Sequence, residues 1–247
     1  MTMNVHQYLM DRIAKGTIHM SLLDPDKQSA EEAGKIALKM KEAGSDAVMI
    51  GGSTGVNAEN LSATAKAIRE MSGLPTIHFP SGPAELSPDV DSIFFMSLMN
   101  SADLNMVMGY QVYGAPVIRK LGIETISMGY VIVEPGMKVG EVGKAMLVKR
   151  DEVKKAVAYA IACEMFGMDF VYFEAGSGAP EPVPTEIVAA VKAAVKIPVI
   201  IGGGIRTPEA AEAIRKAGAD AIVTGTFIEQ CSDDSKLKAV VAASKGL

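Results

Sequence analysis

Several residue types that direct proteins toward particular functions are scarce in this 247-residue chain. It has no tryptophan, three histidines and two cysteines, Cys163 and Cys231, which lie far apart in the sequence. Two distant cysteines provide neither a disulfide framework nor the ligand spacing of a zinc site, so a reducing cytoplasm is the expected location. The histidines show no triad or metal-ligand spacing, and we assign no role to His6, His19 or His78, of which His19 is expected to be a satisfied core residue.

The chain also lacks the charge and the long apolar runs that other classes of protein need. Its formal net charge is −5, from 24 Lys and Arg against 29 Asp and Glu. Without a basic cluster, this balance argues against nucleic acid as a partner. The N-terminus lacks the apolar segment of a signal peptide, and the longest uncharged apolar stretch, 104–118, is shorter than the ~20 residues of a membrane span. Hydrophobic residues form 49% of the chain, which excludes disorder.

Short, β-branched apolar runs alternate with longer segments of helical periodicity along the whole chain. This alternation is typical of parallel strands joined by crossover helices. Strands are predicted at 17–23, 47–50, 76–79, 92–96, 124–133, 170–173, 199–201 and 221–224. Helices are predicted at 30–42, 57–71, 102–120, 150–166, 185–195, 208–217 and 236–244. We interpret the chain, 1–247, as a single (βα)8-barrel domain; a doubly wound open sheet is the alternative, but its GxGxxG loop is missing.

Two local patterns refine this barrel prediction. The segment 79–91 carries three prolines that make a continuous helix improbable, so irregular chain replaces the third crossover helix. A repeated order of helix end, glycine, aspartate and strand indicates equivalent units. Its glycines stand where a helix ends in the left-handed conformation, and they are Gly44, Gly167 and Gly218.

Glycine-rich segments follow the last two predicted strands. In a barrel the functional residues lie at the C-terminal ends of the strands, so these segments are candidates for a site. The residues concerned are Gly202, Gly203 and Gly204 after the seventh strand, and Gly225 and Thr226 after the eighth. Such turns let backbone N–H groups approach a phosphate at a helix N-terminus, where Thr207 can cap the helix and Pro208 fits its first turn. A phosphate site is the preferred interpretation, and tight turns that merely need glycine are the alternative.

The sixth strand ends in a carboxylate followed by further donors. Glu174 precedes Gly176, Ser177 and Gly178, which can contribute N–H and hydroxyl groups to the same phosphate. A carboxylate in this place can accept a hydrogen bond from a substrate hydroxyl and take its proton, or it can tie neighbouring loops together. Tyr172 either faces the barrel interior beside Glu174 or is a core residue with a satisfied hydroxyl.

The first two strands end in hard oxygen donors. Asp24 and Ser53 follow them, with neither histidine nor cysteine nearby. This combination suits Mg²⁺, which keeps several waters and typically bridges one or two protein oxygens to substrate phosphates. Lys27 is a candidate partner for a diphosphate, or a solvated lysine at a helix start.

Methionine and tyrosine gather around the fourth strand and the helix after it. The residues are Met96, Met99, Met106, Met108, Tyr110 and Tyr113. We interpret them as core packing, with a groove for a long apolar ligand as the alternative.

Five motifs, taken together, resemble the geranylgeranylglyceryl phosphate synthase family of prenyltransferases, which includes bacterial heptaprenylglyceryl phosphate synthases. The motifs are LLDPDK, GGST, YFEAGSG, GGGIRTPE and GT, in this order at the predicted strand ends. The resemblance covers essentially the whole chain, and YFEAGSG with the later GGGI and GT is its most specific part. Members of the family are modified (βα)8 TIM barrels in which irregular or extended chain replaces the third helix.

The resemblance implies a Mg²⁺-dependent prenyltransferase that makes archaeal-type ether membrane lipids. Such an enzyme joins a prenyl diphosphate, here first expected to be geranylgeranyl diphosphate, to the C3 hydroxyl of sn-glycerol 1-phosphate and releases diphosphate. Glu174 would position and deprotonate this hydroxyl, and Asp24 and Ser53 would hold Mg²⁺ on the diphosphate. The residues implied to hold sn-glycerol 1-phosphate are Tyr172, Phe173, Glu174, Ala175, Gly176, Ser177, Gly178, Gly203, Gly204, Gly225 and Thr226.

The resemblance also implies a homo-oligomer, either a dimer or a hexamer. We further expect peripheral contact with a membrane, from which the apolar tail of the donor would be drawn. Two other functions are weighed against this one. A sugar-phosphate isomerase or lyase of the histidine or tryptophan biosynthesis type shares the phosphate site but needs an acid–base partner opposite Asp24, and none is evident. The other is a non-catalytic barrel that binds phosphoglycerol.

Overall fold

The chain forms a closed barrel of eight parallel strands, arranged in the order in which they occur in the sequence. The computed structural model describes residues 4–52, 55–231 and 233–247. The strands are β1 (Ile18–Leu23), β2 (Ala47–Ile50), β3 (Thr76–His78), β4 (Ser92–Leu98), β5 (Glu124–Ile132), β6 (Phe170–Glu174), β7 (Val199–Gly202) and β8 (Ala221–Thr224). Pairing of β8 with β1 closes the sheet, so the barrel prediction is confirmed and the open-sheet alternative is wrong.

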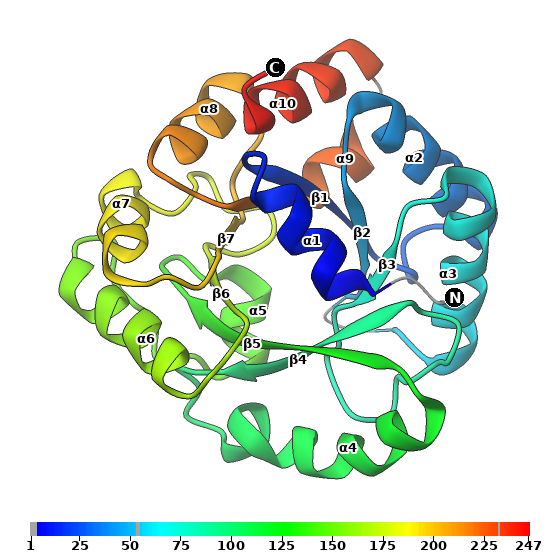
Figure 1. Cartoon of the computed structure of the whole chain (residues 1–247), viewed down its shortest axis with the longest axis horizontal. Coiled ribbons are helices and arrows are strands. Elements are labelled where there is room, and N and C mark those ends of the chain that lie inside the picture. The colour runs from blue at the N-terminus through cyan, green and yellow to red at the C-terminus, as the bar shows by residue number, and fades with distance from the viewer. Residues whose placement is uncertain (1–3, 53–54, 232) are drawn as a thin grey trace.

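Helices surround the barrel, apart from α1 (Val5–Ile13), which lies across one end of it (Figure 1). The other helices are α2 (Ala30–Ala43), α3 (Ala58–Ser72), the π-helical turn η1 (Asn105–Gly109), α4 (Tyr110–Leu121), α5 (Met137–Val142), α6 (Val153–Met165), α7 (Thr185–Ala194), α8 (Pro208–Lys216), α9 (Thr226–Gln230) and α10 (Asp234–Lys245). The seven predicted helices are confirmed to within about one turn, with η1 and α4 sharing the segment predicted as one helix. The helices α1, α5 and α9 were not predicted from the sequence. No helix among the described residues is long and apolar enough to cross a membrane.

The local patterns behave as the sequence predicts. Residues 79–91 form turns and bends without a helix or strand, so irregular chain stands in place of the third crossover helix. Gly44 caps α2 with φ +103°, and Gly167 and Gly218 also have positive φ, at +74° and +105°. These conformations cost L-residues energy that glycine does not incur.

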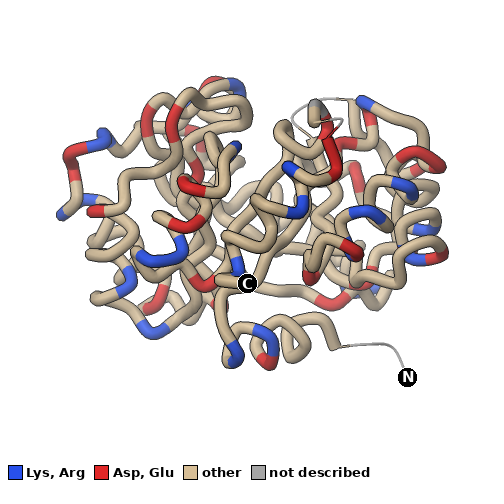
Figure 2. The backbone as a smooth tube through the Cα atoms, turned by 90° about the horizontal axis from the view of Figure 1, so that it is seen from above, with Lys and Arg blue, Asp and Glu red and all other residues tan. Residues whose placement is uncertain are grey.

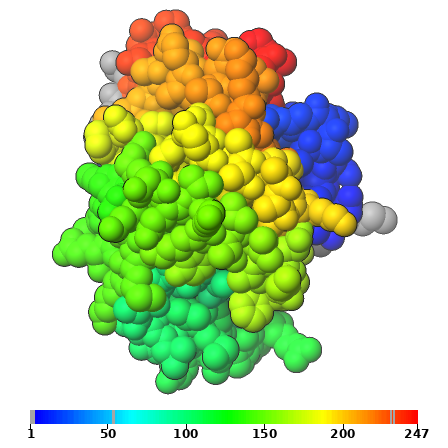
Figure 3. Space-filling model, turned by 90° about the vertical axis from the view of Figure 1, so that its left-hand side faces the viewer, coloured from blue at the N-terminus to red at the C-terminus, as the bar shows by residue number. Residues whose placement is uncertain are grey.

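Alternating side chains divide the core into an interior and an exterior part. The barrel interior is filled by one apolar cluster that includes Phe94, Tyr130 and Tyr172. The helix α1 closes the N-terminal end of the barrel, because its fully buried Val5 and Leu9 belong to this interior cluster. Figures 2 and 3 show α1 lying across one end of the molecule, outside the ring of the other helices.

An aspartate stands directly before each even-numbered strand, at the N-terminal end of the barrel. Each carboxylate accepts a hydrogen bond from a backbone N–H group of the preceding strand, at 2.8–3.0 Å. The pairs are Asp46 with His19, Asp91 with Thr76, Asp169 with Ser127, and Asp220 with Val199. This repeated contact joins neighbouring strands at the end opposite to the predicted site.

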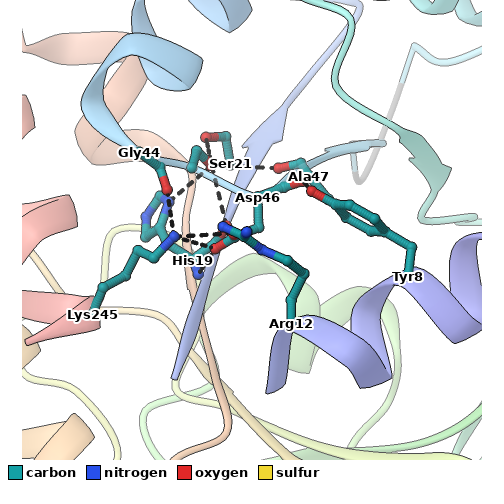
Figure 4. A network of polar contacts seen from close by, with 9 residues as sticks. Tyr8, Arg12, His19, Ser21, Gly44, Asp46, Ala47 and Lys245 are labelled. Atoms are coloured by element: carbon teal, nitrogen blue, oxygen red, sulfur yellow. Dashed lines mark hydrogen bonds and ion pairs between the residues drawn. The ribbon is translucent and has the colours of Figure 1, made fainter. Parts of the chain in front are cut away.

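Asp46 accepts more hydrogen bonds than the other three aspartates do (Figure 4). Its fully buried carboxylate accepts hydrogen bonds from Arg12 Nε at 2.8 Å and from Lys245 Nζ at 2.9 and 3.0 Å. It thereby connects α1, β1 and α10. The neighbouring His19 ring lies between Ser45 Oγ at 3.0 Å and Thr224 Oγ1 at 2.9 Å, and burial lowers its pKa to about 4. The expectation of a satisfied core histidine is confirmed.

Candidate active site

A cavity of about 420 Å³ lies at the C-terminal ends of the strands. Its lining includes five of the residues predicted to form the site, namely Asp24, Glu174, Ser177, Gly225 and Thr226. These residues come from β1, β6 and β8 and their following loops. The closure of the barrel thus brings together segments that are up to about 200 residues apart in the sequence.

Glu174 is the last residue of β6 and is almost fully buried, with 6% of its surface exposed. The Tyr172 hydroxyl donates a hydrogen bond to its Oε2 at 2.6 Å, and the Gly176 N–H donates to its Oε1 at 2.7 Å. Burial raises the pKa of Glu174 above its ordinary value, although both hydrogen bonds act in the opposite direction. The result is a fixed carboxylate with increased proton affinity, which suits a general base.

Tyr172 faces the barrel interior and lies beside Glu174. The structure thus agrees with the first of the two alternatives predicted for this residue. Its ring centroid lies 5.0 Å from that of Tyr130, and its hydroxyl is occupied by Glu174. Burial raises the pKa of Tyr172 well above its ordinary value, so the phenol remains a hydrogen-bond donor. By contrast, Phe173 and Ala175 point outward into the core between barrel and helices, which leaves only their main chain on the side of the site.

Close approach of the main chain to neighbouring groups requires glycine at the two positions after β7, with Glu174 near Gly203 and Glu181 near Gly204. A Cβ atom at Gly203 would lie 2.2 Å from Glu174 Oε1 and 2.7 Å from Gly176 N. Gly203 also has φ +80°, and Gly204 has φ +73° with the Glu181 main chain at 2.5 Å from a Cβ position. The need for glycine at these tight turns is therefore confirmed. Binding of a phosphate by their backbone N–H groups stays a prediction.

Hydroxyl groups converge on these turns from two other loops. Ser177, after β6, and Thr226, at the start of α9, hydrogen-bond to each other through their side chains. Thr207 caps α8 by accepting a hydrogen bond from Ala210 N at 3.2 Å, with Pro208 in the first turn, as predicted. The loops after β6, β7 and β8 thus form one cup of small residues, hydroxyls and main chain.

Asp24 forms a second polar region of the cavity, next to the loop after β8, because β1 pairs with β8 in the closed barrel. A Cβ atom at Gly52 would lie 2.4 Å from each atom of the Asp24 carboxyl group, so this carboxylate rests against the end of β2. Ser53, its predicted companion, lies outside the described residues. Lys27 Nζ is 3.7 Å from Asp24 Oδ2 and 2.7 Å from Glu229 Oε2. The sequence patterns did not predict Glu229, because its contacts with Lys27 and Asp24 exist only in the closed barrel.

The donor set around Asp24 fits Mg²⁺ better than a softer metal. Among residues 4–52, 55–231 and 233–247, no three His, Cys, Asp or Glu side chains gather as a metal-binding group. One carboxylate that lines an open cavity leaves most of the coordination shell to water and substrate oxygens. Mg²⁺ is commonly bound in this way.

The cavity continues as an apolar arm over β4. Its lining there includes Ile93, Phe95 and Met96 of β4, and Met106 and Tyr110 before and at the start of α4. The segment 79–91 also contributes to this arm, where a third crossover helix would otherwise lie. Met96 and Met106 also pack against the interior core cluster, so core packing is confirmed for these two residues, which line the cavity as well. Tyr110 lines the cavity without belonging to that cluster.

The remaining members of this methionine–tyrosine group lie elsewhere. Met99 packs against the outer core, so the core interpretation is confirmed for this residue. Met108 and Tyr113 are 56% and 70% exposed and contribute to neither core nor cavity.

Comparison with known proteins assigns the chain to a family. The model of the PcrB family matches residues 10–244, which is nearly the whole chain. The chain belongs to the PcrB family. The resemblance inferred from the five motifs is thereby confirmed.

Two curated relatives of this PcrB family member share the same name. The chain is 48% identical over 228 residues to the geranylgeranylglyceryl phosphate synthase of Picrophilus torridus, covering 92% of this chain and 94% of the relative. It is 47% identical over 234 residues to the protein of that name from Thermococcus kodakarensis, covering 95% and 93%.

A crystal structure provides the same comparison in three dimensions. The (S)-3-O-geranylgeranylglyceryl phosphate synthase from Thermoplasma acidophilum, in complex with its substrate sn-glycerol-1-phosphate, has a TM-score of 0.96 and 44% identity to this chain. The match covers 99% of this chain and 100% of that one. The barrel of this PcrB family member therefore matches that of the Thermoplasma acidophilum protein along nearly the whole chain.

Proposed function

We propose that this protein is a geranylgeranylglyceryl phosphate synthase, which transfers a prenyl group from its diphosphate to sn-glycerol 1-phosphate in ether lipid synthesis. The observation that carries the proposal is the position of Glu174. This buried carboxylate stands between a cup of glycines and hydroxyls and the beginning of a long apolar cavity. A small phosphorylated alcohol and a long apolar donor can meet at such a point.

The acceptor binds on the side of β6, β7 and β8. Backbone N–H groups at Gly203, Gly204 and Gly225 and the hydroxyls of Ser177 and Thr226 hold its phosphate. Main chain at 172–178 and the Glu174 carboxylate hold the glycerol. The Glu174 carboxylate accepts a hydrogen bond from the C3 hydroxyl and orients it toward the donor.

The transfer step exchanges one C–O bond for another. The C3 oxygen forms a bond to C1 of the prenyl chain while the bond from C1 to the diphosphate breaks. The electron pair of the broken bond leaves with the diphosphate, and the hydroxyl proton passes to Glu174. Because burial raises the pKa of Glu174, its carboxylate takes this proton more readily than an exposed glutamate would.

The donor binds on the side of β1 and β2, with its tail in the apolar arm. Asp24 and Ser53 would hold Mg²⁺, and Lys27 contributes an ammonium group to the diphosphate. When bound, Mg²⁺ supplies positive charge that stabilises the departing diphosphate. The aliphatic and aromatic side chains along β4 and α4 exclude water from the prenyl chain.

We infer that the protein works as a cytoplasmic homo-oligomer, a dimer or hexamer, that meets membranes only peripherally. Acidic and basic residues are intermixed around its helices in Figure 2, and such a distribution does not favour nucleic acid as a partner.

Release of diphosphate by the purified protein tests the proposal. Geranyl, farnesyl, geranylgeranyl and longer prenyl diphosphates are offered in parallel, each with sn-glycerol 1-phosphate. We expect release that requires the acceptor, a prenyl donor and Mg²⁺, and that stops on chelation. Asp24→Ala should abolish the response to Mg²⁺. Turnover of a sugar phosphate without Mg²⁺, or binding of both substrates without release, would favour one of the other two functions.

A further inference from the structure

Glu229 is an unexpected residue in a cavity for phosphorylated substrates. It lies on α9 and lines the cavity, with 11% of its side chain exposed. A carboxylate repels a diphosphate, and this repulsion grows where water is partly excluded. Its presence at this point therefore needs a compensating role.

Both carboxylate oxygens of Glu229 are used by the loop that follows β1. Oε2 accepts a hydrogen bond from Lys27 Nζ at 2.7 Å, and Oε1 accepts one from the Asp24 N–H at 3.3 Å. Lys27 and Glu229 are 202 positions apart in the sequence, so the contact exists only in the closed barrel. A single side chain thus fixes the direction of a flexible lysine and the main chain of the residue assigned to Mg²⁺.

The second lysine on the cavity wall provides a contrast. Among the described residues that line the cavity, the cationic side chains are Lys27 and Lys138. Lys138 pairs at 3.0 Å with Glu141, one turn away on α5, and these side chains are 59% and 73% exposed. Such a pair is solvated and local, so it fixes little. The partner of Lys27 is shielded and comes from another element.

The helix α9 also contributes residues to both halves of the cavity. Thr226, the first residue of α9, belongs to the cup that holds the acceptor phosphate, while Glu229 on the same helix holds the loop that faces the donor. The two halves of the cavity are thus joined through one short helix.

We propose that Glu229 is a positioning residue for the prenyl diphosphate, acting through the Lys27 ammonium and the Asp24 main chain. This inference rests on the proposed function. Lys27 is held at the diphosphate end of the cavity before the donor arrives, so less side-chain freedom is lost on binding. The binding free energy gained because Lys27 is already held in place exceeds the electrostatic repulsion between the Glu229 carboxylate and the diphosphate.

The direction in which Glu229→Gln changes the affinity for diphosphate distinguishes a positioning role from simple charge repulsion. Glu229→Gln removes a negative charge and keeps the shape of the side chain. If charge alone mattered, the variant would bind diphosphate more tightly. We expect about 10-fold weaker binding of inorganic diphosphate with Mg²⁺ in titration calorimetry, because Lys27 is no longer held. The KM for the prenyl diphosphate should rise by about the same factor, while that for sn-glycerol 1-phosphate stays within about 2-fold.

A double-mutant cycle identifies the route of the effect. Lys27→Met should weaken diphosphate binding about 10-fold. Adding Glu229→Gln to Lys27→Met should weaken binding by clearly less than the roughly 10-fold loss that it causes alone, because only the contact with the Asp24 main chain is then lost. Glu141→Gln, which frees the other cavity lysine, is the matched control and should bind as the unaltered enzyme does. Because Lys27 is half exposed, Lys27→Met examines the same contact even if Glu229→Gln is poorly folded.

Two results would overturn the inference. One is equal or tighter diphosphate binding by Glu229→Gln, and the other is a combined variant whose loss of diphosphate affinity equals the product of the two single losses. The proposed function is judged separately. If the unaltered protein transferred no prenyl group, that function would fail while the calorimetric comparison still decided the role of Glu229. If it transferred prenyl groups and Glu229→Gln behaved identically, only the positioning role would fail.

Discussion

At the scale of the residue, the protonation state of Glu174 controls the proposed chemistry. A general base must be ionised, so activity falls as the pH drops through its pKa. Burial places this pKa above the ordinary value of a glutamate, while the Tyr172 hydroxyl and the Gly176 N–H stabilise the ionised form. Removing one of these donors therefore raises the pKa further.

Tyr172→Phe should move the acidic limb of the kcat profile to higher pH. The substitution deletes the hydrogen bond to Glu174 Oε2 and leaves the ring in place. Activity well above the limb should be retained to within about 10-fold. Steady-state rates between pH 4 and 9 provide the measurement, and Glu174→Gln should lower kcat about 10²-fold or more at every pH. A limb that stayed in place in Tyr172→Phe would contradict the role of its hydroxyl.

Two glycines with similar backbone conformation make a matched pair. Gly203 and Gly167 have φ +80° and +74°, but a Cβ at Gly203 meets Glu174 whereas one at Gly167 meets nothing within 4 Å. Gly203→Ala should raise the KM for sn-glycerol 1-phosphate at least about 10-fold, because Glu174 and Gly176 must move. Gly167→Ala should cost about 1 kcal/mol of unfolding free energy and leave this KM unchanged. If Gly203→Ala and Gly167→Ala changed the KM for sn-glycerol 1-phosphate equally, backbone strain alone would explain both effects.

Much of the site could be predicted from single residues and their place after a strand. Glu174, Gly203 and Thr226 follow apolar runs directly, and the barrel rule places such residues at one mouth. Glu229 could not be found in this way, because its partners are 202 and 205 positions away and no local pattern marks it.

At the scale of the element, regular strands and long amphipathic helices were the easiest to predict. Their periodicity is strong, and the prolines of 79–91 correctly excluded the third crossover helix. The missed elements are short: α5 and α9 contain six and five residues and have no side-chain cap. The capped helix α1 had one signal, since Asn4 precedes Val5 and Leu9, which are spaced one turn apart.

The aspartates before the even-numbered strands carry a prediction for stability. Asp46→Asn should lower the unfolding free energy by about 3 kcal/mol, because Arg12 and Lys245 lose their shared buried partner. Urea unfolding followed by circular dichroism measures the change. Glu31→Gln, which breaks an exposed pair with Lys35, is the control and should unfold like the unaltered chain. The Asp46→Asn protein should keep its KM values, because its change lies at the opposite end of the barrel.

At the scale of the whole molecule, one helical face lacks an intramolecular partner among the described residues. Leu104, Met108, Val112, Tyr113 and Val117, along η1 and α4, are 45–70% exposed. An apolar face of this kind is typical of an association surface. We predict self-association through it.

Light scattering tests this prediction, because each protomer has a mass of 25.9 kDa. We expect the mass of a dimer or hexamer for the unaltered chain and a smaller assembly for Val112→Glu. A monomer throughout the micromolar range would contradict the predicted oligomer.

The central claim is that this barrel joins a prenyl group to the C3 hydroxyl of sn-glycerol 1-phosphate. Mass spectrometry of the product tests it most directly, after incubation with geranylgeranyl diphosphate, Mg²⁺ and either sn-glycerol 1-phosphate or its 3-phosphate enantiomer. The account predicts one geranylgeranylglyceryl phosphate, formed from the 1-phosphate and absent from Glu174→Gln over the same time. A product that formed equally well without Glu174, or no prenylated product from any donor length, would contradict it.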